Sequence, residues 1–383
     1  MSIAATPERP KTKPTLLVID DETGPRDALQ VILRPFFNVQ TAESASAAID
    51  VLNSQRIDII TLDQKLPDRQ GIELLQDIKH HHAGIEVIII TGYGSLKAAM
   101  DGIRHGAAGY LLKPFNVTEL LSLVNQTLEK KQRLDFLRSF ISTSTGLWGS
   151  ETECAQAWKD IFAGYQGIGE RQSDPASRTE ERPDLLPLLS DLLEAKDRQL
   201  LNHCSRVSFY ATLLANRINL TVAEQKSLAV GAFLHDIGKI GPEPYQFADD
   251  EISMKGESLG NRRHPEQGAK LVLPLGLPAE VGQIIAYHHE RWDGAGYPFG
   301  LKENGIPQLA RIVCIAQTFD HMTAELPGRT PLSIDSACRQ LLTYSGTHFD
   351  PKFTELFAQV ALECKASLPA MAMATTPADR SES

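Results

Sequence analysis

The segment FLHDIGKIG places His235 directly before Asp236, with Lys239 one helical turn later. An adjacent imidazole and carboxylate can bind one metal ion together, or the carboxylate can bridge two ions. The alternative is structural, because any helix can carry such a pair and a buried histidine is commonly held by a hydrogen bond to a neighbour. The pair therefore indicates a metal site only if further ligands lie elsewhere in the chain.

Four further histidines are candidate ligands: His203, His264 and the doublet His288–His289, which precedes RWDGAGYP. Each alone is more often structural or exposed. Adjacent residues of a helix point about 100° apart, so both members of the doublet can ligate only from a helix edge that faces the site. Helical bundles build metal sites from histidines on separate inward-facing helices. The coincidence of all four with the histidine–aspartate pair predicts a metal centre.

A second group of polar residues follows apolar runs in the first third of the chain. The acids Asp20, Asp21 and Asp63 end or follow the runs TLLVID and RIDIITLD, and Thr91 and Lys113 come at the ends of two later runs. Carboxylates that converge at strand ends bind a hard cation such as Mg²⁺, and a hydroxyl with an ammonium suits the oxygens of an acyl phosphate. Acids that merely face solvent are the alternative, but five matched positions favour a site.

These runs predict a doubly wound (βα)5 domain of the α/β class. Apolar strand segments at 15–20, 37–41, 56–63 and 86–92, and the segment AAGYLLKPF, alternate with helical patterns. Strands that are apolar throughout form a parallel sheet covered on both faces. The chemistry of such a fold lies at the carboxyl ends of its strands, where the acids are.

Changes of pattern divide the chain into four parts. Residues 14–130 are the α/β domain, 131–184 a helical extension with a polar linker, 185–365 an all-α helical bundle, and 366–383 a disordered tail. The helix that leaves the first domain either pairs with a copy of itself or only overruns the sheet as a covering helix. Its heptad pattern is too short to decide between the two.

Composition excludes several classes of function. The 383 residues carry a net charge of −10, which opposes a surface that coats nucleic acid. None of the five cysteines stands in a C-x-x-C motif, and an odd number of cysteines without this spacing is typical of reduced thiols. No apolar run is long enough to span a bilayer, and the N-terminal residues lack the apolar core of a signal peptide. We therefore expect a cytoplasmic protein with neither DNA nor a membrane as partner.

Residues 14–130 resemble the receiver domain of two-component response regulators through VIDDE, TLDQKLPDRQG, IIITGYGS and YLLKPF, which stand in the order and spacing of that family. The resemblance implies that Asp63 accepts a phosphoryl group from a cognate sensor histidine kinase. It also implies a cis peptide bond before Pro114. The other receiver-site residues would be Asp20 and Asp21 for Mg²⁺, Thr91 and Lys113 for the phosphoryl group, and Tyr110 as the aromatic switch.

Residues from about 190 to 362 resemble an HD-GYP domain of the HD superfamily, the output domain that hydrolyses cyclic di-GMP. The resemblance is carried by EAKD, HCSRV, HDIGKIG, HPEQG, HHERWDGAGYP, IPQLARI and GTHFDP. It implies two divalent metals, iron or manganese, that activate water against a phosphodiester. The ligands would be His203, His235, the bridging Asp236, His264, His288 and His289.

The same resemblance assigns residues to the substrate. Asp236 and Lys239 would be catalytic, with Lys239 neutralising or protonating near the scissile phosphate. Glycines in the loop would let it approach the ligand closely, although turn chemistry alone allows a plain turn. The substrate-binding residues would be Arg291, Gly296, Tyr297, Pro298 and Arg329.

Three positions depart from the family pattern. Gln317 stands where the family has a metal-binding aspartate, and Asp320, three residues on, is a candidate substitute on the same helical face. Leu326 stands in a run whose basic residues hold the substrate's phosphates, so that only Arg329 is retained. Gln199 replaces a glutamate ligand of three-metal members, which favours two metals.

Two functions follow from these patterns. The first is a response regulator in which phosphorylation controls metal-dependent hydrolysis of cyclic di-GMP to pGpG or GMP. The alternative is a degenerate HD-GYP response regulator that senses the nucleotide or docks other proteins without catalysis. We expect the partners to be the sensor kinase, cyclic di-GMP, a second copy of the chain and proteins of the GGDEF type.

Overall fold

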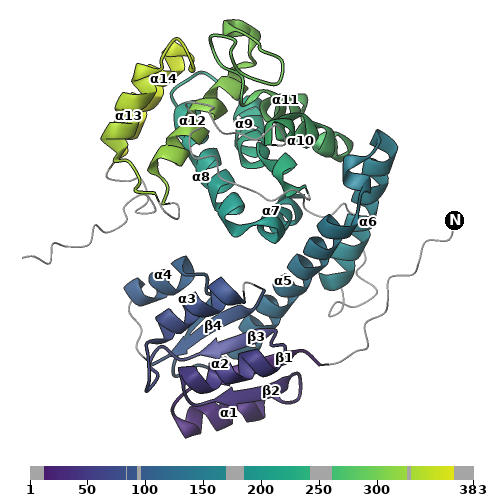
Figure 1. Cartoon of the computed structure of the whole chain (residues 1–383), viewed down its shortest axis with the longest axis vertical. Coiled ribbons are helices and arrows are strands. Elements are labelled where there is room, and N and C mark those ends of the chain that lie inside the picture. Colours follow the sequence, from purple (N-terminus) through teal and green to yellow (C-terminus); the bar gives the residue numbers. More distant parts are fainter. Residues whose placement is uncertain are drawn as a thin grey trace, which may run out of the picture. The chain divides into compact units, whose positions relative to one another are not determined.

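The structure is a computed structural model that describes residues 13–82, 84–92, 96–169, 185–241, 261–325 and 329–365. The chain folds as two compact units (Figure 1). The first ends at Asp135, and the second begins at Phe136 and holds nearly all of the later residues. The predicted tail, most of the polar linker and Leu326 lie outside the described residues. In the described ranges, no helix is both long and apolar enough to cross a membrane.

The first unit is built on a parallel sheet of five strands in the order β2-β1-β3-β4-β5. The strands are β1 (Thr15–Ile19), β2 (Asn38–Ala42), β3 (Ile59–Leu62), β4 (Glu86–Thr91) and β5 (Gly109–Leu112). The helices that alternate with them are α1 (Thr23–Leu33), α2 (Ala45–Ser54), α3 (Gly71–His81), α4 (Leu96–Arg104) and α5 (Val117–Thr143). This topology confirms the predicted doubly wound fold.

Both faces of the sheet are covered, which explains why its strands read as continuous apolar runs. Leu17 and Ile19 of β1 belong to one core together with residues of α2 and α3. Leu16 and Val18 belong to a second core together with residues of α1 and α5. Side chains alternate along a strand, so a strand buried on both faces has no polar side to expose. The acids Asp20 and Asp63 directly follow β1 and β3, outside these buried segments.

The second unit is helical, which confirms the predicted bundle; its described residues form only isolated bridges and no strand. Its principal helices are α6 (Glu151–Gly169), α7 (Leu185–Lys196), α8 (Arg198–Ala215), α9 (Val222–Leu234), α10 (His264–Val272), α11 (Ala279–Tyr287), α12 (Gln308–Thr323), α13 (Ile334–Thr343) and α14 (Pro351–Glu363). The short 3-10 helices are η1 (Gly146–Trp148), η4 (Ile237–Ile240), η5 (Asn261–Arg263), η6 (Leu273–Leu275) and η7 (Glu303–Gly305). Helix α12 is buried along nearly its whole length and packs against α8, α11, α13 and α14.

Helix α6 packs onto this bundle through buried aromatic and aliphatic side chains. Trp158 and Ile161 are fully buried, and the Trp158 indole Nε1 donates to the carbonyl oxygen of Leu271 in α10 at 2.8 Å. The Tyr165 hydroxyl donates to Asp191 of α7 at 2.7 Å. Helix α6 lies within the part of the chain predicted as a helical extension, and residues 136–167 group with the second unit.

Candidate metal centre and phospho-acceptor site

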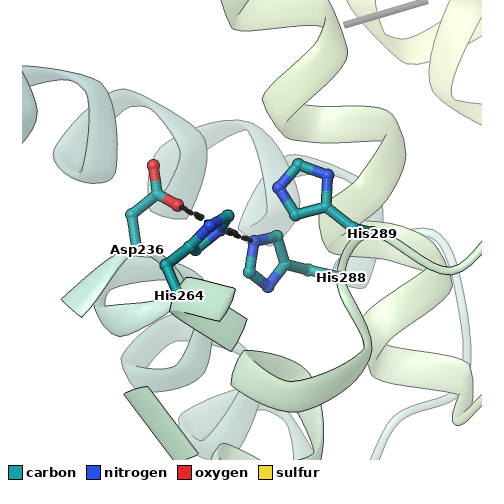
Figure 2. Close-up of side chains that lie close together, drawn as sticks. All are labelled: Asp236, His264, His288 and His289. Atoms are coloured by element: carbon teal, nitrogen blue, oxygen red, sulfur yellow. Dashed lines mark hydrogen bonds and ion pairs between the residues drawn. The ribbon is translucent and has the colours of Figure 1, made fainter. Parts of the chain in front are cut away.

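The histidines predicted as metal ligands converge on Asp236, and Figure 2 shows one of the two groups that they form. In each group the possible ligand atoms lie within 4.8 Å of one another. One group is Asp236, His264, His288 and His289, and the other is His203, His235 and the same Asp236. The structure therefore brings all six predicted residues together around one carboxylate.

The two oxygens of Asp236 face different groups. Oδ1 lies 3.2 Å from Nε2 of His264 and 3.7 Å from Nε2 of His288. Oδ2 lies 3.5 Å from Nε2 of His235 and 3.6 Å from Nε2 of His203. A carboxylate that presents one oxygen to each of two imidazole groups has the arrangement of a bridging metal ligand.

Helix ends bring the adjacent ligands together. Helix α9 ends at Leu234, directly before His235, and α11 ends at Tyr287, directly before the doublet. His289 thus lies beyond the regular helix, so the angle between neighbouring helical side chains does not restrict it. The ring centroids of His288 and His289 lie 4.3 Å apart, and both rings belong to the same group.

Two glycines allow the ligand-bearing segments to touch. A Cβ atom added at Gly238 of η4 would lie 2.0 Å from the carbonyl oxygen of His264 and 2.8 Å from the backbone nitrogen of Gly268. A Cβ atom added at Gly268 would lie 3.0 Å from the backbone nitrogen of Gly238. The backbones of η4 and α10 are therefore in direct contact, and this contact sets the separation of Asp236 from His264.

Hydrogen bonds on the outer side of three rings fix their orientation. Nδ1 of His235 lies 2.7 Å from the carbonyl oxygen of Ala232, and Nδ1 of His288 lies 2.8 Å from that of Ile285. Because a carbonyl can only accept, both rings must carry their proton on Nδ1 and present Nε2 to the centre. Nδ1 of His203 lies 2.7 Å from Oδ2 of Asp320.

Burial keeps the donor set in its metal-binding form. Burial lowers the pKa of His264 to about 4 and lowers the pKa values of His203, His235 and His289 as well. For Asp236 burial acts in the opposite direction, but Lys239 and the neighbouring imidazoles bring its pKa well below the usual value. Neutral imidazoles around an ionised carboxylate are the state that binds a cation.

The donor atoms fit divalent metals. Among the described residues, Nε2 of His289 is buried without a hydrogen-bond partner. Imidazole nitrogens with a carboxylate suit iron, manganese or zinc. Lys239 donates to Oδ2 of Asp236 at 2.7 Å, so an ammonium also lies at the edge of the centre.

The loop that follows the histidine doublet folds back over it. The Tyr297 ring stacks on the His289 ring at 4.7 Å with an interplanar angle of 14°, and the Arg262 guanidinium lies 5.6 Å from the Tyr297 centroid. A Cβ atom at Gly296 would lie 2.3 Å from the backbone nitrogen of Arg291, so only glycine permits this approach. The peptide bond before Pro298 is cis.

A buried acid that the sequence reading missed holds this loop. Glu290 is 2% exposed and accepts hydrogen bonds from the backbone nitrogens of Phe299 at 2.8 Å and Leu301 at 2.9 Å. Its place beside the histidine doublet was visible in the sequence, but its partners depend on the path of the loop. Arg291, a predicted substrate residue, forms a two-point pair with Asp293. Arg329 is half-buried.

The positions that depart from the family pattern have defined contacts. Gln317 is buried, and its Nε2 donates to the carbonyl oxygen of His288 at 3.3 Å. Asp320 does not act as the substitute ligand that its helical spacing suggested, because Arg206 and Nδ1 of His203 occupy its oxygens. It lies behind the His203 ring instead. Gln199 is exposed in the first turn of α8.

The first unit brings its predicted residues to one edge of the sheet. Asp20, Asp21 and Asp63 form a third group with ligand atoms within 4.8 Å of one another. Nζ of Lys113 donates to Oδ2 of Asp20 at 2.7 Å and to Oδ2 of Asp63 at 2.6 Å. Burial alone would lower the pKa of Lys113, but these two carboxylates raise it. Thr91 is buried at the end of β4.

Three further features surround the acid cluster. The pKa of the half-buried Tyr110 phenol is raised by burial and by the charge of Asp63. The peptide bond between Lys113 and Pro114 is cis, as predicted. A Cβ atom at Gly71 would lie 2.3 Å from the carbonyl oxygen of Asp63, so the loop after β3 returns close to its own start.

Comparison with known families assigns both units. A model of the response regulator receiver domain matches residues 16–125, and a model of the HD domain matches residues 187–353. The chain belongs to the response regulators that carry an HD domain. The receiver domain of this HD-domain response regulator contains the acid cluster with Lys113, and its HD domain contains the histidine groups around Asp236.

Three curated relatives extend over most of this HD-domain response regulator. A "Probable cyclic di-GMP phosphodiesterase" of Vibrio cholerae is 29% identical over 90% of this chain and 77% of the relative. A "Cyclic di-GMP phosphodiesterase" of Thermotoga maritima is 27% identical over 91% of both chains. The "Cyclic di-GMP phosphodiesterase response regulator RpfG" of Xanthomonas campestris is 26% identical over 88% of this chain and 85% of the relative.

Proposed function

We propose that this HD-domain response regulator hydrolyses cyclic di-GMP at the Asp236 centre and that phosphorylation of Asp63 controls the reaction. The observation that carries the proposal is the division of the histidines into two groups that share one carboxylate. Enzymes that hydrolyse phosphodiesters by a two-metal mechanism hold two cations side by side in this way. The names of the relatives support cyclic di-GMP as the substrate.

The chain's own residues would hold the two cations, for which we propose iron or manganese. Bound there, the metals would supply Lewis acidity toward the phosphate oxygens and an activated water. The proposed ligands are His203, His235 and Asp236 for one ion, and Asp236, His264, His288 and His289 for the other.

Lys239 and the loop after the doublet are proposed to act on the substrate. The Lys239 ammonium, 2.7 Å from Asp236, adds positive charge where the scissile phosphate would bind. Tyr297 stacks on a proposed metal ligand, and its phenol is proposed to contact the bound dinucleotide. Gly296 and Pro298 hold the Tyr297 backbone, and Arg291 and Arg329 are proposed to pair with the dinucleotide.

Control is proposed to begin at Asp63, with a sensor histidine kinase as phosphoryl donor. A carboxylate oxygen would attack the phosphorus of a kinase phosphohistidine, and Lys113 would pair with the transferred oxygens. Asp20 and Asp21 would hold Mg²⁺ beside them. Thr91 and Tyr110 would respond to the new charge. The result would be a two-state change passed to the HD domain.

The test is a turnover assay on the full chain. Protein loaded with Fe²⁺ or Mn²⁺ should convert cyclic di-GMP to pGpG or GMP, with a higher rate after beryllofluoride treatment of the receiver. Asp236→Asn should abolish turnover, because it replaces one of the two bridging oxygens by an NH₂ group and removes the negative charge that both groups share. Absence of product with either metal, in both receiver states, would refute the proposed activity. Equal rates with and without beryllofluoride would refute the proposed control.

The non-catalytic alternative also has an observation in its favour. Gln317 supplies no charge to the centre, and its amide nitrogen donates a hydrogen bond to the carbonyl oxygen of His288. A site weakened in this way would bind nucleotide or protein partners without hydrolysis. Metal stoichiometry separates the two functions: about two ions per chain are expected for the enzyme, and one or none for the degenerate form.

A further inference from the structure

His203 differs from the other oriented ligands in what holds its ring. His235 and His288 each donate to a neutral carbonyl three residues earlier in the same helix segment. His203 instead meets a carboxylate from a distant part of the chain, with Nδ1 2.7 Å from Oδ2 of Asp320. An ionised carboxylate can only accept, so the proton lies on Nδ1 and the lone pair of Nε2 points to the centre.

Arg206 fixes the carboxylate. Nε of Arg206 donates to Oδ1 of Asp320 at 2.6 Å, and Nη2 donates to Oδ2 at 2.9 Å. This two-point pair leaves the Asp320 carboxylate no freedom to rotate. Asp320 itself is only 1% exposed. Both oxygens are engaged, so the residue acts on the His203 ring and does not bind a metal.

The group formed by His203 and His235 has little charge of its own. Among the described residues its only carboxylate is Asp236, which the second group shares. Gln317 contributes no charge. A further negative charge, Asp320, reaches the group through a hydrogen bond to His203. A carboxylate behind a ligating imidazole raises the basicity of the ring and holds its tautomer.

We propose that Asp320 and Arg206 are a positioning pair for His203, which hold the Nδ1–H tautomer and thereby set the affinity of this half of the centre for a divalent cation. The affinity part rests on the proposed function, because it requires that the centre binds metal. The tautomer part stands on the hydrogen bonds alone. It is measurable in metal-free protein.

The decisive variant is Asp320→Asn. The asparagine amide puts an NH₂ group where one oxygen stood. If the oxygen stays with Nε of Arg206, the closer partner, the NH₂ group faces both Nη2 of Arg206 and Nδ1 of His203. It then loses the hydrogen bond from Nη2 and donates to Nδ1. The ring proton then moves to Nε2 and points at the metal position. A wrong tautomer of this kind disables a histidine while the geometry is kept.

Two measurements read the result. Nitrogen-15 NMR of the metal-free protein should show His203 as the Nδ1–H form in the parent chain and the Nε2–H form in Asp320→Asn. Calorimetric titration with Mn²⁺ should show one of two sites weakened about 10- to 100-fold, the range for loss of an outer partner, with the other site unchanged. A parent ring protonated on Nε2, or a folded variant with both sites at parent affinity, would overturn the proposal.

Matched variants separate positioning from folding. Asp350 is also buried and paired with an arginine, Arg311, and its other hydrogen bonds come from backbone nitrogens at the start of α14. Asp350→Asn should therefore cost stability and leave both Mn²⁺ affinities unchanged. If Asp320→Asn does not fold, Arg206→Lys replaces it: the His203 tautomer should persist, and the affinity of one site should fall by a smaller factor. Unchanged affinities in a folded Arg206→Lys would then overturn the proposal.

The outcomes also distinguish this inference from the proposed function. If the parent chain binds two Mn²⁺ ions, Asp320→Asn loses one of them, and no cyclic di-GMP is hydrolysed, the positioning pair is supported and the proposed enzymatic activity is refuted. If Asp320→Asn hydrolyses cyclic di-GMP as well as the parent and binds Mn²⁺ with the parent affinity, the enzymatic activity is supported and the positioning pair is refuted.

Discussion

The contact between η4 and α10 makes Gly238 a sensitive test of how the metal centre is assembled. A methyl group at this position would lie 2.0 Å from the carbonyl oxygen of His264 and 2.8 Å from the backbone nitrogen of Gly268. Both obstacles are backbone atoms, so no side-chain rotation can relieve the overlap. In Gly238→Ala, η4 and α10 must move apart by roughly 1 Å to restore ordinary contact distances.

That movement has two consequences of known size. Overpacking of a closely packed interior costs about 1–3 kcal/mol, and each kcal/mol lowers the melting temperature of a domain of this size by roughly 2–4 °C. The same movement separates His264 from Asp236, now 3.2 Å apart between Nε2 and Oδ1. Metal sites tolerate displacements of only about 0.2 Å. We therefore expect a lower melting temperature and loss of metal from the group that contains His264.

The assay pairs Gly238→Ala with Gly282→Ala. A Cβ atom at Gly282, within α11, meets nothing within 4 Å, so this substitution should leave metal content unchanged and should not lower stability. Melting curves of the metal-free proteins and metal analysis of the loaded proteins are compared. A Gly238→Ala protein that melts with the parent and retains all of its metal would refute the argument that this backbone contact sets the ligand spacing.

Three further predictions address charge and protonation. Burial lowers the pKa of His264 to about 4, against 6.5 in the unfolded chain, so the unfolded chain binds more protons between these two pH values. The stability of the metal-free protein should therefore be fully present above about pH 6.5 and decline toward pH 4. A melting temperature that does not change over this pH range would contradict the prediction. Asp63→Asn should abolish labelling by a phosphodonor, whereas Asp68→Asn, an exposed receiver acid, should not; labelling that persists in Asp63→Asn would place the acceptor elsewhere. Gln317→Asp should raise metal content, measured by elemental analysis, because it adds charge to the donor set; unchanged content would show that the amide is not a weakness of the site.

The parallel sheet and the candidate metal ligands could be predicted from the sequence because both depend on local sequence patterns. Leu16 to Ile19 form an unbroken apolar run, which is possible only where both faces of a strand are buried. Asp20 and Asp63 follow such runs directly, so the parallel topology brings them together without further information. His235 and Asp236 are neighbours in sequence, and their chemistry limits what the pair can do.

The residues behind the ligands could not be placed in the same way. Spacing along α12 put Asp320 near Gln317, but its true partner, His203, lies on α8 and meets it only when the two helices pack together. Arg206 is three residues after His203 on one helix face, so the sequence did contain a signal for an outer partner. That signal does not say which acid the guanidinium binds. The role of Glu290 could not be predicted either, because its hydrogen-bond partners are backbone nitrogens of a loop.

The attachment of α6 has a practical meaning for dissecting this protein. Trp158 and the Cys154 thiol both donate to the carbonyl oxygen of Leu271, the last turn of the helix that begins with His264. A fragment cut to the matched HD region, 187–353, would strip this cover away and leave the far end of a ligand-bearing helix unsupported. The compact unit that begins at Phe136 is thus larger than the region matched by the HD-domain model, and an excised output domain should retain α6 together with the end of α5.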